Sequence, residues 1–291
     1  MTAPITAPSS GSSAGRAAVP VEGRWRSLAA TYATMARVSV LAQFQYRAAN
    51  YFYMIGMVAE PIVYLVVWST IARQQGGSVE GYTAGNFAAY YIVWTLVRNM
   101  NIVFTPFGWE ERIRTGELSG WMLRPGHPIH YDLAFFAGWK FVVIIMWLPI
   151  AAVLSLLFRP ELETNALQVA VFVVAIWGAY LIRSLALWVL GMITFWTTRV
   201  TALYEAYFVA ELLLSGRLVP MDLLPDWAQA VAWFLPFQWT FAFPITALVG
   251  PITTAELLVG LLMQGLWIAI GTLAVRIVWH RGVRRYGAVG G

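Results

Sequence analysis

Long apolar segments separated by short polar ones dominate the chain. Six of them predict helices that cross a membrane core of ~30 Å. They run over about residues 51–71, 87–109, 133–158, 166–196, 201–214 and 254–278, and the fifth is the shortest. Polar residues, glycines or prolines bound each segment. The pattern therefore predicts an all-α membrane protein with six transmembrane helices.

The segments at the two ends of the chain differ in composition from this core. Residues 1–22 are rich in Ala, Pro, Ser, Thr and Gly, which predicts a disordered tail, and residues 286–291 predict a flexible one. The six-span domain between them covers 23–285. From Trp25 to Gln45, Arg26 and Arg37 alternate with apolar residues at helical spacing, which predicts an amphipathic helix lying on the inner membrane surface. The alternative is a plain cytosolic helix.

The stretch from Glu110 to Ile129 is the longest polar run after the N-terminal tail. Charged residues are interleaved with apolar ones at helical spacing, which predicts a short amphipathic helix between the second and third spans. Gly120 and Pro125 are expected to end it. Two interpretations stay open: the helix presents its charges to a soluble partner, or it is only a solvated connector.

Composition narrows the class of protein and excludes several kinds of chemistry. The 291 residues are 59% hydrophobic and 11% charged, against about 25% charged in soluble domains. The absence of cysteine excludes disulfides, thiolate metal sites and cysteine nucleophiles. Lys140 is the only lysine. Because it does not follow a glycine-rich loop, the chain has no Walker A motif and cannot be its own P-loop ATPase.

The distribution of arginines sets the predicted orientation. With the N-terminus inside, twelve arginines fall in inner segments and three in outer ones, which follows the positive-inside rule. The inner ones are Arg16, Arg24, Arg26, Arg37, Arg47, Arg112, Arg114, Arg124, Arg199, Arg281, Arg284 and Arg285, and the outer ones are Arg73, Arg159 and Arg217. Both termini and the stretch from Glu110 to Ile129 are therefore predicted to be cytoplasmic, in a multi-pass plasma-membrane protein.

The segment between the fifth and sixth spans has a pattern of its own. Its apolar part is interrupted by Pro236 and Pro244, which leaves pieces too short to cross a bilayer. Backbone of this kind is tolerated at membrane depth where protein covers it. The pattern favours a re-entrant hairpin entered from the outer face. A kinked seventh span is the alternative, but it would place the C-terminal arginines outside.

Several polar residues fall near the middle of the predicted spans: Glu60, Arg98, Asn101, Arg183 and Glu211. A charge at that depth is costly unless it is paired or hydrated. The residues predict ion pairs that fix the packing of the spans, and a polar cargo path or contact with lipid headgroups are the alternatives. His127, His130 and Asp132 are interpreted as ordinary surface residues, so no metal site is predicted.

Two of these segments resemble one known family, the ABC-2 type transporter permeases. The first resembles the family's coupling helix between spans two and three, and the second its re-entrant outer helices between spans five and six. The coupling residues are Glu111, Arg112, Arg114, Gly116, Glu117, Leu118, Leu123, Arg124 and Pro125. The hairpin residues are Ser215, Gly216, Pro220, Pro225, Pro236 and Pro244. The six-span plan and the N-terminal surface helix agree with the resemblance.

The resemblance implies a non-catalytic permease subunit of an ATP-driven exporter. Two separate ABC ATPase subunits would dock on the coupling helices and carry ATP and Mg, so no cofactor is expected on this chain. A second permease subunit, identical or similar, would complete the path. The many aromatic residues favour an amphiphilic or apolar cargo such as a drug, a natural product or a lipid, and nothing suggests nucleic acid. A secondary transporter or a structural, partner-binding membrane subunit is the alternative.

Overall fold

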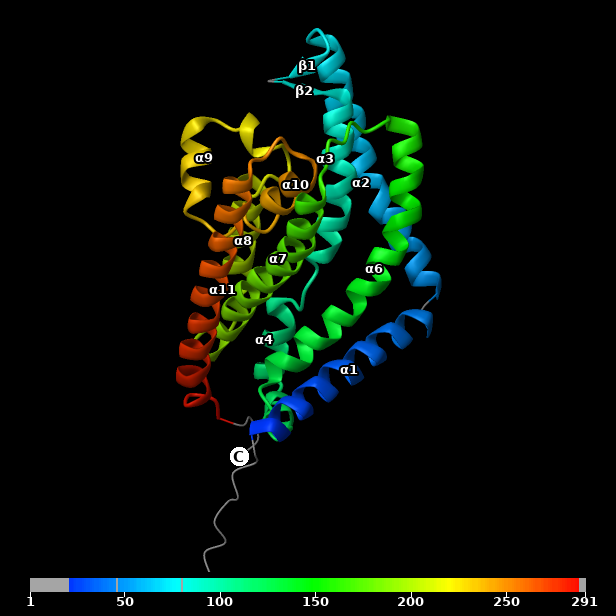
Figure 1. Ribbon diagram of the computed structural model, residues 1–291. Helices are drawn as coiled ribbons and strands as arrows, with labels where there is room; N and C mark the ends of the chain where they lie inside the picture. The colour runs from blue at the N-terminus through cyan, green and yellow to red at the C-terminus, as the bar shows by residue number, and fades with distance from the viewer. Residues whose placement is uncertain (1–20, 46, 80, 288–291) are drawn as a thin grey trace, which may run out of the picture.

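The computed structural model describes residues 21–45, 47–79 and 81–287 (Figure 1). The predicted N-terminal tail therefore lies outside the described residues except for Val21 and Glu22, which begin the first helix. The end of the predicted C-terminal tail, 288–291, also lies outside them. Tyr286, at the start of that tail, contacts the folded part through its hydroxyl, 3.2 Å from the Ser119 hydroxyl.

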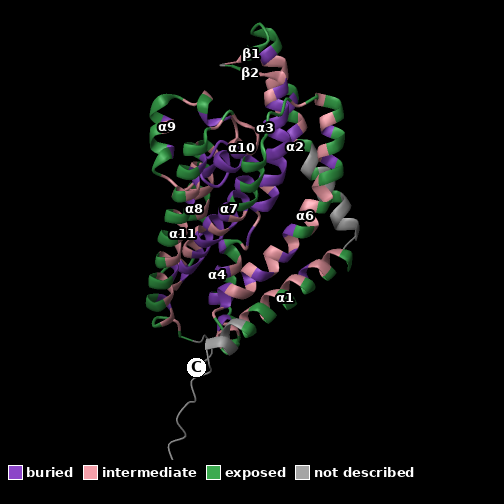
Figure 2. Ribbon diagram, viewed as in Figure 1, coloured by how far each residue is buried: buried purple, intermediate pink, exposed green. Residues whose placement is uncertain are grey.

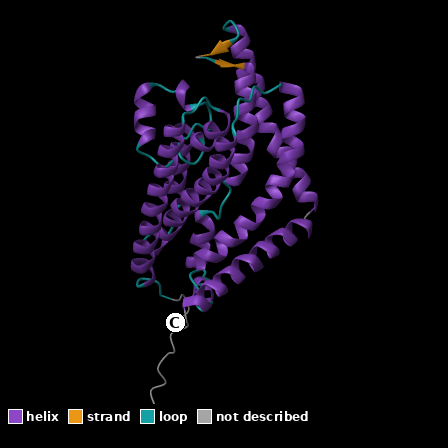
Figure 3. Cartoon of the chain, in the orientation of Figure 1, coloured by secondary structure: helices purple, strands orange, loops and turns teal. Residues whose placement is uncertain are grey.

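Helices make up almost all of the described structure (Figure 3). A single antiparallel hairpin of two short strands is present among the described residues, so the predicted all-α class holds apart from it. The elements are α1 (Val21–Gln45), α2 (Arg47–Gln74), β1 (Ser78–Val79), β2 (Tyr82–Thr83), α3 (Ala84–Met100), α4 (Pro106–Arg114), α5 (Leu118–Met122), α6 (Pro128–Phe158), α7 (Ala166–Met192), η1 (Ile193–Phe195), α8 (Thr201–Leu214), η2 (Met221–Leu223), α9 (Asp226–Trp233), α10 (Ala242–Val249) and α11 (Thr254–Val283).

Three of the described helices are long and apolar enough to cross a membrane: α6, α7 continued through η1, and α11. Their outer surfaces agree with this, since large apolar side chains such as Leu156 and Leu262 are 81% and 72% exposed. Contiguous apolar surface of this kind needs a membrane or a partner to cover it. By contrast, α3 has 17 residues and α8 has 14. The count of six spans therefore stays a prediction.

The limits predicted for five of the six apolar segments agree with the structure to within a few residues. The fifth segment has the bounds of α8, while α6 and α11 extend the third and sixth segments by several residues. The fourth segment ends at Met192 and passes into the short 3₁₀ turn η1. The second segment, predicted as one helix over 87–109, is wrong: α3 ends at Met100, and α4 begins only at Pro106.

The break between α3 and α4 has local causes in the sequence. Thr105 adopts an extended backbone and caps α4 by accepting a hydrogen bond from the Gly108 N–H. Pro106 follows at the first helical position, where its missing N–H costs nothing. A cap and a proline together start a new helix. Residues 101–105 therefore leave the helical path within what had been predicted as one span.

The stretch from Glu110 to Ile129 was predicted as one short helix, and this is also corrected by the structure. It contains the end of α4 and the separate helix α5, with a turn between them. Gly116 makes that turn with a φ of 79°, in the left-handed region that favours glycine. The two helices therefore fold back on each other and form a compact unit before α6 begins.

The core lies around α3 and α7 (Figure 2). Nearly every residue of α3 is buried, and Tyr90, Trp94 and Met100 are among the most enclosed side chains. The helices α2, α6 and α10 cover α3, while α11, α10 and α4 pack on α7. Two buried helices at the centre with exposed apolar helices around them are the arrangement expected of a bundle that lipid surrounds.

The helix α1 crosses α6 at an angle and packs closely along its first half (Figure 1). Gly138 of α6 makes the crossing possible, because a Cβ atom at this position would lie 2.4 Å from the Ala36 Cα atom. The Tyr32 hydroxyl adds a hydrogen bond of 3.1 Å to Nδ1 of His130. Leu41 and Phe44 stay exposed on the other side of α1. A helix is present where the sequence predicts one, and its role as an amphipathic helix on a membrane surface stays a prediction.

The two ends of the bundle are formed by different elements (Figure 1). The start of α1, the helix α4 and the end of α11 lie at one end, and the β-hairpin and α9 lie at the other. The predicted orientation requires the stretch from Glu110 to Ile129 and both ends of the folded part to share a side. The arrangement of the helices meets that requirement.

Substitution of Gly138 by alanine is expected to loosen the contact of α1 with α6, because the added methyl group would overlap the Ala36 backbone. The melting temperature of the purified chain in detergent should fall. Gly265→Ala in α11 is the matched control, since nothing lies within 4 Å of a Cβ there. The control should melt at the same or a higher temperature. Equal melting of Gly138→Ala and the unsubstituted chain would contradict the close crossing.

Candidate functional site

The segment after α8 forms short helices rather than a span. Both α9 and α10 have eight residues, which makes each about 12 Å long and too short to cross a bilayer. Pro220 and Pro225 directly precede η2 and α9. Pro236 lies between α9 and α10, and Pro244 lies in the first turn of α10. Pro236 thus lies in a break as predicted, but Pro244 does not divide the segment, because α10 continues through it. The entry of the segment into the membrane stays a prediction.

Ser215 and Gly216 fix the turn that leads from α8 into this segment. The Ser215 carbonyl accepts a 2.9 Å hydrogen bond from the Ala242 N–H. Gly216 has a φ of 81°, and its carbonyl accepts a 2.7 Å hydrogen bond from the Tyr90 hydroxyl. A side chain at Gly216 would meet the Ala242 Cβ atom at 2.8 Å. The two residues therefore tie the end of α8 to α3 and α10.

At the opposite end of the bundle, Arg112 anchors α4 to α6. Its guanidinium makes two hydrogen bonds to the Asp132 carboxylate, at 2.8 and 3.0 Å. The rings of Phe104 and Trp121 enclose it, with centroids 4.1 and 4.2 Å from Cζ. A bidentate arginine–carboxylate pair of this kind fixes the orientation of α4 relative to α6. Arg112 and the buried Leu118 therefore face the interior of this subunit rather than a partner.

Other coupling residues project from this end into solvent, and we name Glu111, Arg114, Glu117, Leu123 and Arg124 the coupling tip. Leu123 is 88% exposed, which is unusual for an apolar side chain among charges. Trp121 holds two of its neighbours: its indole N–H donates to Glu117 at 2.9 Å, and Arg124 stacks on its ring at 4.0 Å. Gly116 and Pro125 turn the chain on either side. The tip is a fixed surface of mixed charge around one exposed leucine.

The helix α4 is also attached to α8. One carboxylate oxygen of Glu110 accepts a 3.1 Å hydrogen bond from the Val200 N–H, just before α8 begins. The other lies 3.5 Å from Arg114. The ring of Phe107 contacts that of Tyr204 edge-on, with centroids 5.1 Å apart. A carboxylate at a helix N-terminus is favourable. A movement of α4 would therefore act on both α6 and α8.

His127 caps α6 at the same end of the molecule. Its Nδ1 atom accepts a hydrogen bond from the Ile129 N–H at 3.3 Å. Burial, together with the nearby His130 and His280, lowers the pKa of His127 to about 4. The imidazole is therefore neutral at pH 7 and keeps the lone pair that the cap needs. With His130 bound to Tyr32 and Asp132 to Arg112, these side chains have structural partners.

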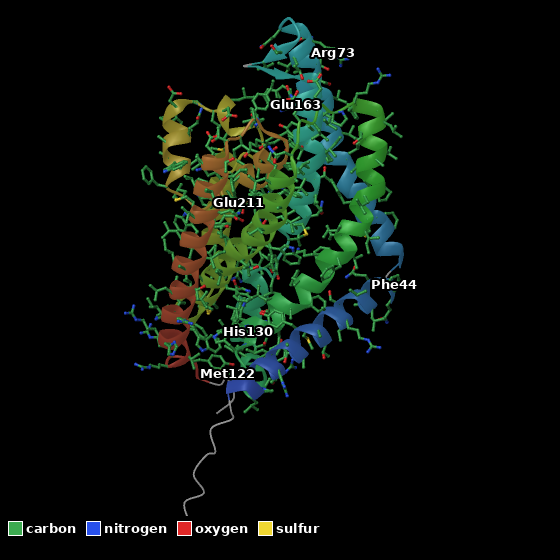
Figure 4. All side chains as sticks on the ribbon, viewed as in Figure 1. Phe44, Arg73, Met122, His130, Glu163 and Glu211 are labelled. Carbon is green, nitrogen blue, oxygen red and sulfur yellow. The ribbon has the colours of Figure 1, made fainter. Side chains whose placement is uncertain are left out.

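The charged residues predicted at mid-span meet in two ion pairs. Arg183 of α7 makes two hydrogen bonds of 2.7 and 2.8 Å to the carboxylate of Glu211, a fully buried residue of α8 (Figure 4). Arg98 of α3 lies 2.7 Å from Glu60 of α2. Arg217, predicted as part of an outer loop, lies 3.7 Å from the other oxygen of Glu60. The structure thus selects these pairs from the four possible combinations.

The break between α3 and α4 lies against these charges. Lys140 of α6 is fully buried, and its ammonium group donates to the carbonyls of Asn99, at 3.2 Å, and of Ile102. Arg183 donates to the Asn101 carbonyl. The Asn101 side chain in turn donates to the Thr240 carbonyl at 2.7 Å. Cations from α6 and α7 therefore bind the carbonyl of Asn99, in the last turn of α3, and the carbonyls of the first two residues after the helix.

With this geometry described, the comparison with known proteins identifies the family. The family model for the ABC-2 family transporter protein matches residues 58–290, which is 233 of the 291 residues. The chain belongs to the ABC-2 transporter family. It is a membrane permease of the ABC-transporter type, and the family implies association with an ABC ATPase and is typically non-catalytic. No curated protein matches the chain. The alternative of a membrane protein outside the ABC class is set aside.

Sequence reasoning missed several residues that hold the permease together. Lys140 binds the break between α3 and α4, and Asp132 binds Arg112. In the sequence, each of the two is an isolated charge in an apolar helix. That isolation was the available signal, since an unpaired charge in such a segment requires a partner. Arg217 was missed because a distance of 157 residues separates it from Glu60 along the chain. Only the return of the chain after α8 brings the two together.

Single and double substitutions of the Arg183–Glu211 pair should separate pairing from burial. Glu211→Gln leaves a buried guanidinium without its counterion, which costs roughly 3–5 kcal/mol. The melting temperature in detergent should therefore fall further for Glu211→Gln than for Arg183→Gln with Glu211→Gln together. Glu60→Gln combined with Arg183→Gln joins members of different pairs and should give additive effects. If the losses of melting temperature were also additive for Arg183→Gln and Glu211→Gln, the two residues would not be directly coupled.

Proposed function

We propose that this permease docks an ABC ATPase subunit on the coupling tip and exports an amphiphilic or apolar cargo. The observation that carries the proposal is the contrast between the two faces of the segment from α4 to α5. Arg112 and Leu118 are buried within the subunit, while Leu123, Arg114 and Glu117 are presented at the end of the molecule. An exposed apolar residue ringed by charges suits a protein partner.

The attachments of α4 support a mechanical role for this contact. Asp132 links α4 to α6, and Val200 links it to α8. Closure of two ATPase subunits on ATP would push on the coupling tip, and these links would pass the displacement to the helices that border the path. Such a device needs two arrangements that the ATPase contact favours differently. A second permease subunit, identical or similar, would supply the other half of the path.

The orientation belongs to the same proposal. The coupling tip and both ends of the folded part would face the cytoplasm, and the β-hairpin, α9 and α10 would lie at the outer face. The arginine bias supports this, because the arginines gather at the end that carries α4. The short helices α9 and α10 would form the re-entrant hairpin, and α2, α3 and α8 would complete six spans. A cargo of apolar character is supported by the aromatic content of the chain.

Substitutions in the coupling tip should separate docking from folding. Leu123→Asp and Glu111→Arg change side chains that are exposed at this end of the molecule. They should leave the melting temperature unchanged but weaken co-purification with the cognate ABC ATPase by about tenfold or more, as loss of an interface anchor does. Arg73→Glu, at the opposite end (Figure 4), is the charge control and should co-purify normally. Normal assembly and export by both tip variants would reduce this segment to a connector.

Cysteine labelling can test the orientation without background, because the chain has no cysteine. Single cysteines at Gly77 and Asp222 are expected to react with a membrane-impermeant maleimide on intact cells. A cysteine at Gly120 is expected to react only after the cells are permeabilised. Labelling of the Gly120 position on intact cells would invert the orientation and remove the basis for ATPase docking at this end.

A further inference from the structure

Glu60, Arg98 and Arg217 form a charge cluster with two cations for one anion. Arg98 lies 2.7 Å from one carboxylate oxygen of Glu60, and Arg217 lies 3.7 Å from the other. The three residues come from α2, from α3 and from the turn after α8. Glu60 is therefore shared between two guanidinium groups, and the cluster keeps a net charge of +1.

The neighbouring charges do not remove this excess. Glu211, the next carboxylate within electrostatic reach of Arg217, is bound through both oxygens to Arg183. Lys140 is directed to the carbonyl groups at the end of α3. Arg183 and Lys140 therefore each have acceptors of their own, which are Glu211 for Arg183 and the backbone carbonyls for Lys140. The uncompensated charge of this region is consequently localised on Arg98 and Arg217.

The hydrogen-bonding capacity of the two arginines is also incomplete. The Nε atoms of both are buried and have no hydrogen-bond partner among the described residues. Neither guanidinium makes the two-point contact to a carboxylate that Arg112 and Arg183 make elsewhere in the chain. Guanidinium groups are suited to such two-point binding of carboxylate or phosphate. The cluster therefore has donors to spare for a second anion.

The surroundings combine access with apolar surface. The side chains of Glu60 and Arg98 are each 29% exposed, and that of Arg217 is 11% exposed. Arg98 lies over the ring of Trp94 at 5.8 Å, and Arg217 lies near the ring of Phe208 at 5.3 Å. A molecule that reaches Arg98 would therefore meet a cation beside aromatic faces.

We propose that Arg98 and Arg217 bind the anionic headgroup, phosphate or carboxylate, of an amphiphile whose apolar part lies against the neighbouring helices. Glu60 competes with the ligand for the two arginines. The binding itself is independent of ATPase docking. Only the description of the ligand as cargo rests on the function proposed above.

Binding of octyl phosphate to the full chain, purified in a maltoside detergent, tests the site by calorimetry. Arg98→Gln and Arg217→Gln should each raise the dissociation constant about tenfold, the loss expected for one charge-assisted hydrogen bond. Glu60→Gln should lower it, because the competing carboxylate is gone. Arg73→Gln, an exposed arginine on the same helix as Glu60, should bind like the unsubstituted chain. Arg98→Lys keeps the charge and should bind more tightly than Arg98→Gln, which gives a readout if the glutamine variant folds poorly.

Three results would overturn the proposal. One is unchanged affinity in both glutamine variants, another is weaker binding by Glu60→Gln, and the third is equal binding of octyltrimethylammonium with the same dependence on Arg98. The second result in particular would mean that Glu60 only supports the fold.

Nanodiscs then distinguish the two sources of the headgroup. If phosphatidylglycerol added to phosphatidylcholine raises the apparent dissociation constant of octyl phosphate, the site holds a resident anionic lipid. If it does not, while octyl phosphate still binds, the ligand is a separate amphiphile such as the cargo. Both results support the site. Because no ATPase is present, failure of binding leaves docking at the coupling tip untouched, and failure of docking leaves this site untouched.

Discussion

The backbone carbonyl groups at the end of α3 have to be satisfied inside a helical bundle, and much of the structure follows from how this is done. A helix that stops within an apolar environment leaves up to four carbonyls without partners. Lys140 and Arg183 donate to the carbonyl of Asn99, in the last turn of α3, and to the carbonyls of Asn101 and Ile102 in the segment that follows it. Their positive charges also oppose the negative end of the helix dipole. Two costly buried cations and a broken helix thus stabilise one another.

The same contacts determine how the later part of the chain is placed. One nitrogen of Arg183 donates to the break after α3, and two other nitrogens donate to Glu211. Arg183, which belongs to α7, therefore connects that segment to α8. Asn101 reaches the Thr240 carbonyl just before α10. The short helix α8 buries only Glu211 fully, and the bond of Glu211 to Arg183 adds to the half-buried contacts of Tyr204 and Tyr207 in holding the helix on the subunit.

The predictable part of this structure is the part that depends on composition and helical periodicity. The bounds of α8, the presence of the helix α1 and the break at Pro236 all follow from patterns that are local in sequence. The break after Met100 was missed, because the apolar run continues through it and outweighs the Thr105–Pro106 start signal. The choice of ion-pair partners was also missed. It depends on the rotation and depth of each helix, which periodicity alone does not specify.

The break also changes what the α4 helix can transmit. A continuous helix from Ala84 to Arg114 would carry a displacement at the coupling tip directly along α3 into the core. Here α4 is joined to α6 by Arg112 and to α8 by Glu110, while its link to α3 is a nonhelical segment. Any rotation of α4 relative to α3 must alter the hydrogen bonds of Lys140 and Arg183 to that segment. Since a buried carbonyl cannot be left without a donor at low cost, the segment favours discrete arrangements in which donors exchange acceptors. The tip would then act on α6 and α8 first, and Arg183, which binds both the break and Glu211, would couple that movement to the core.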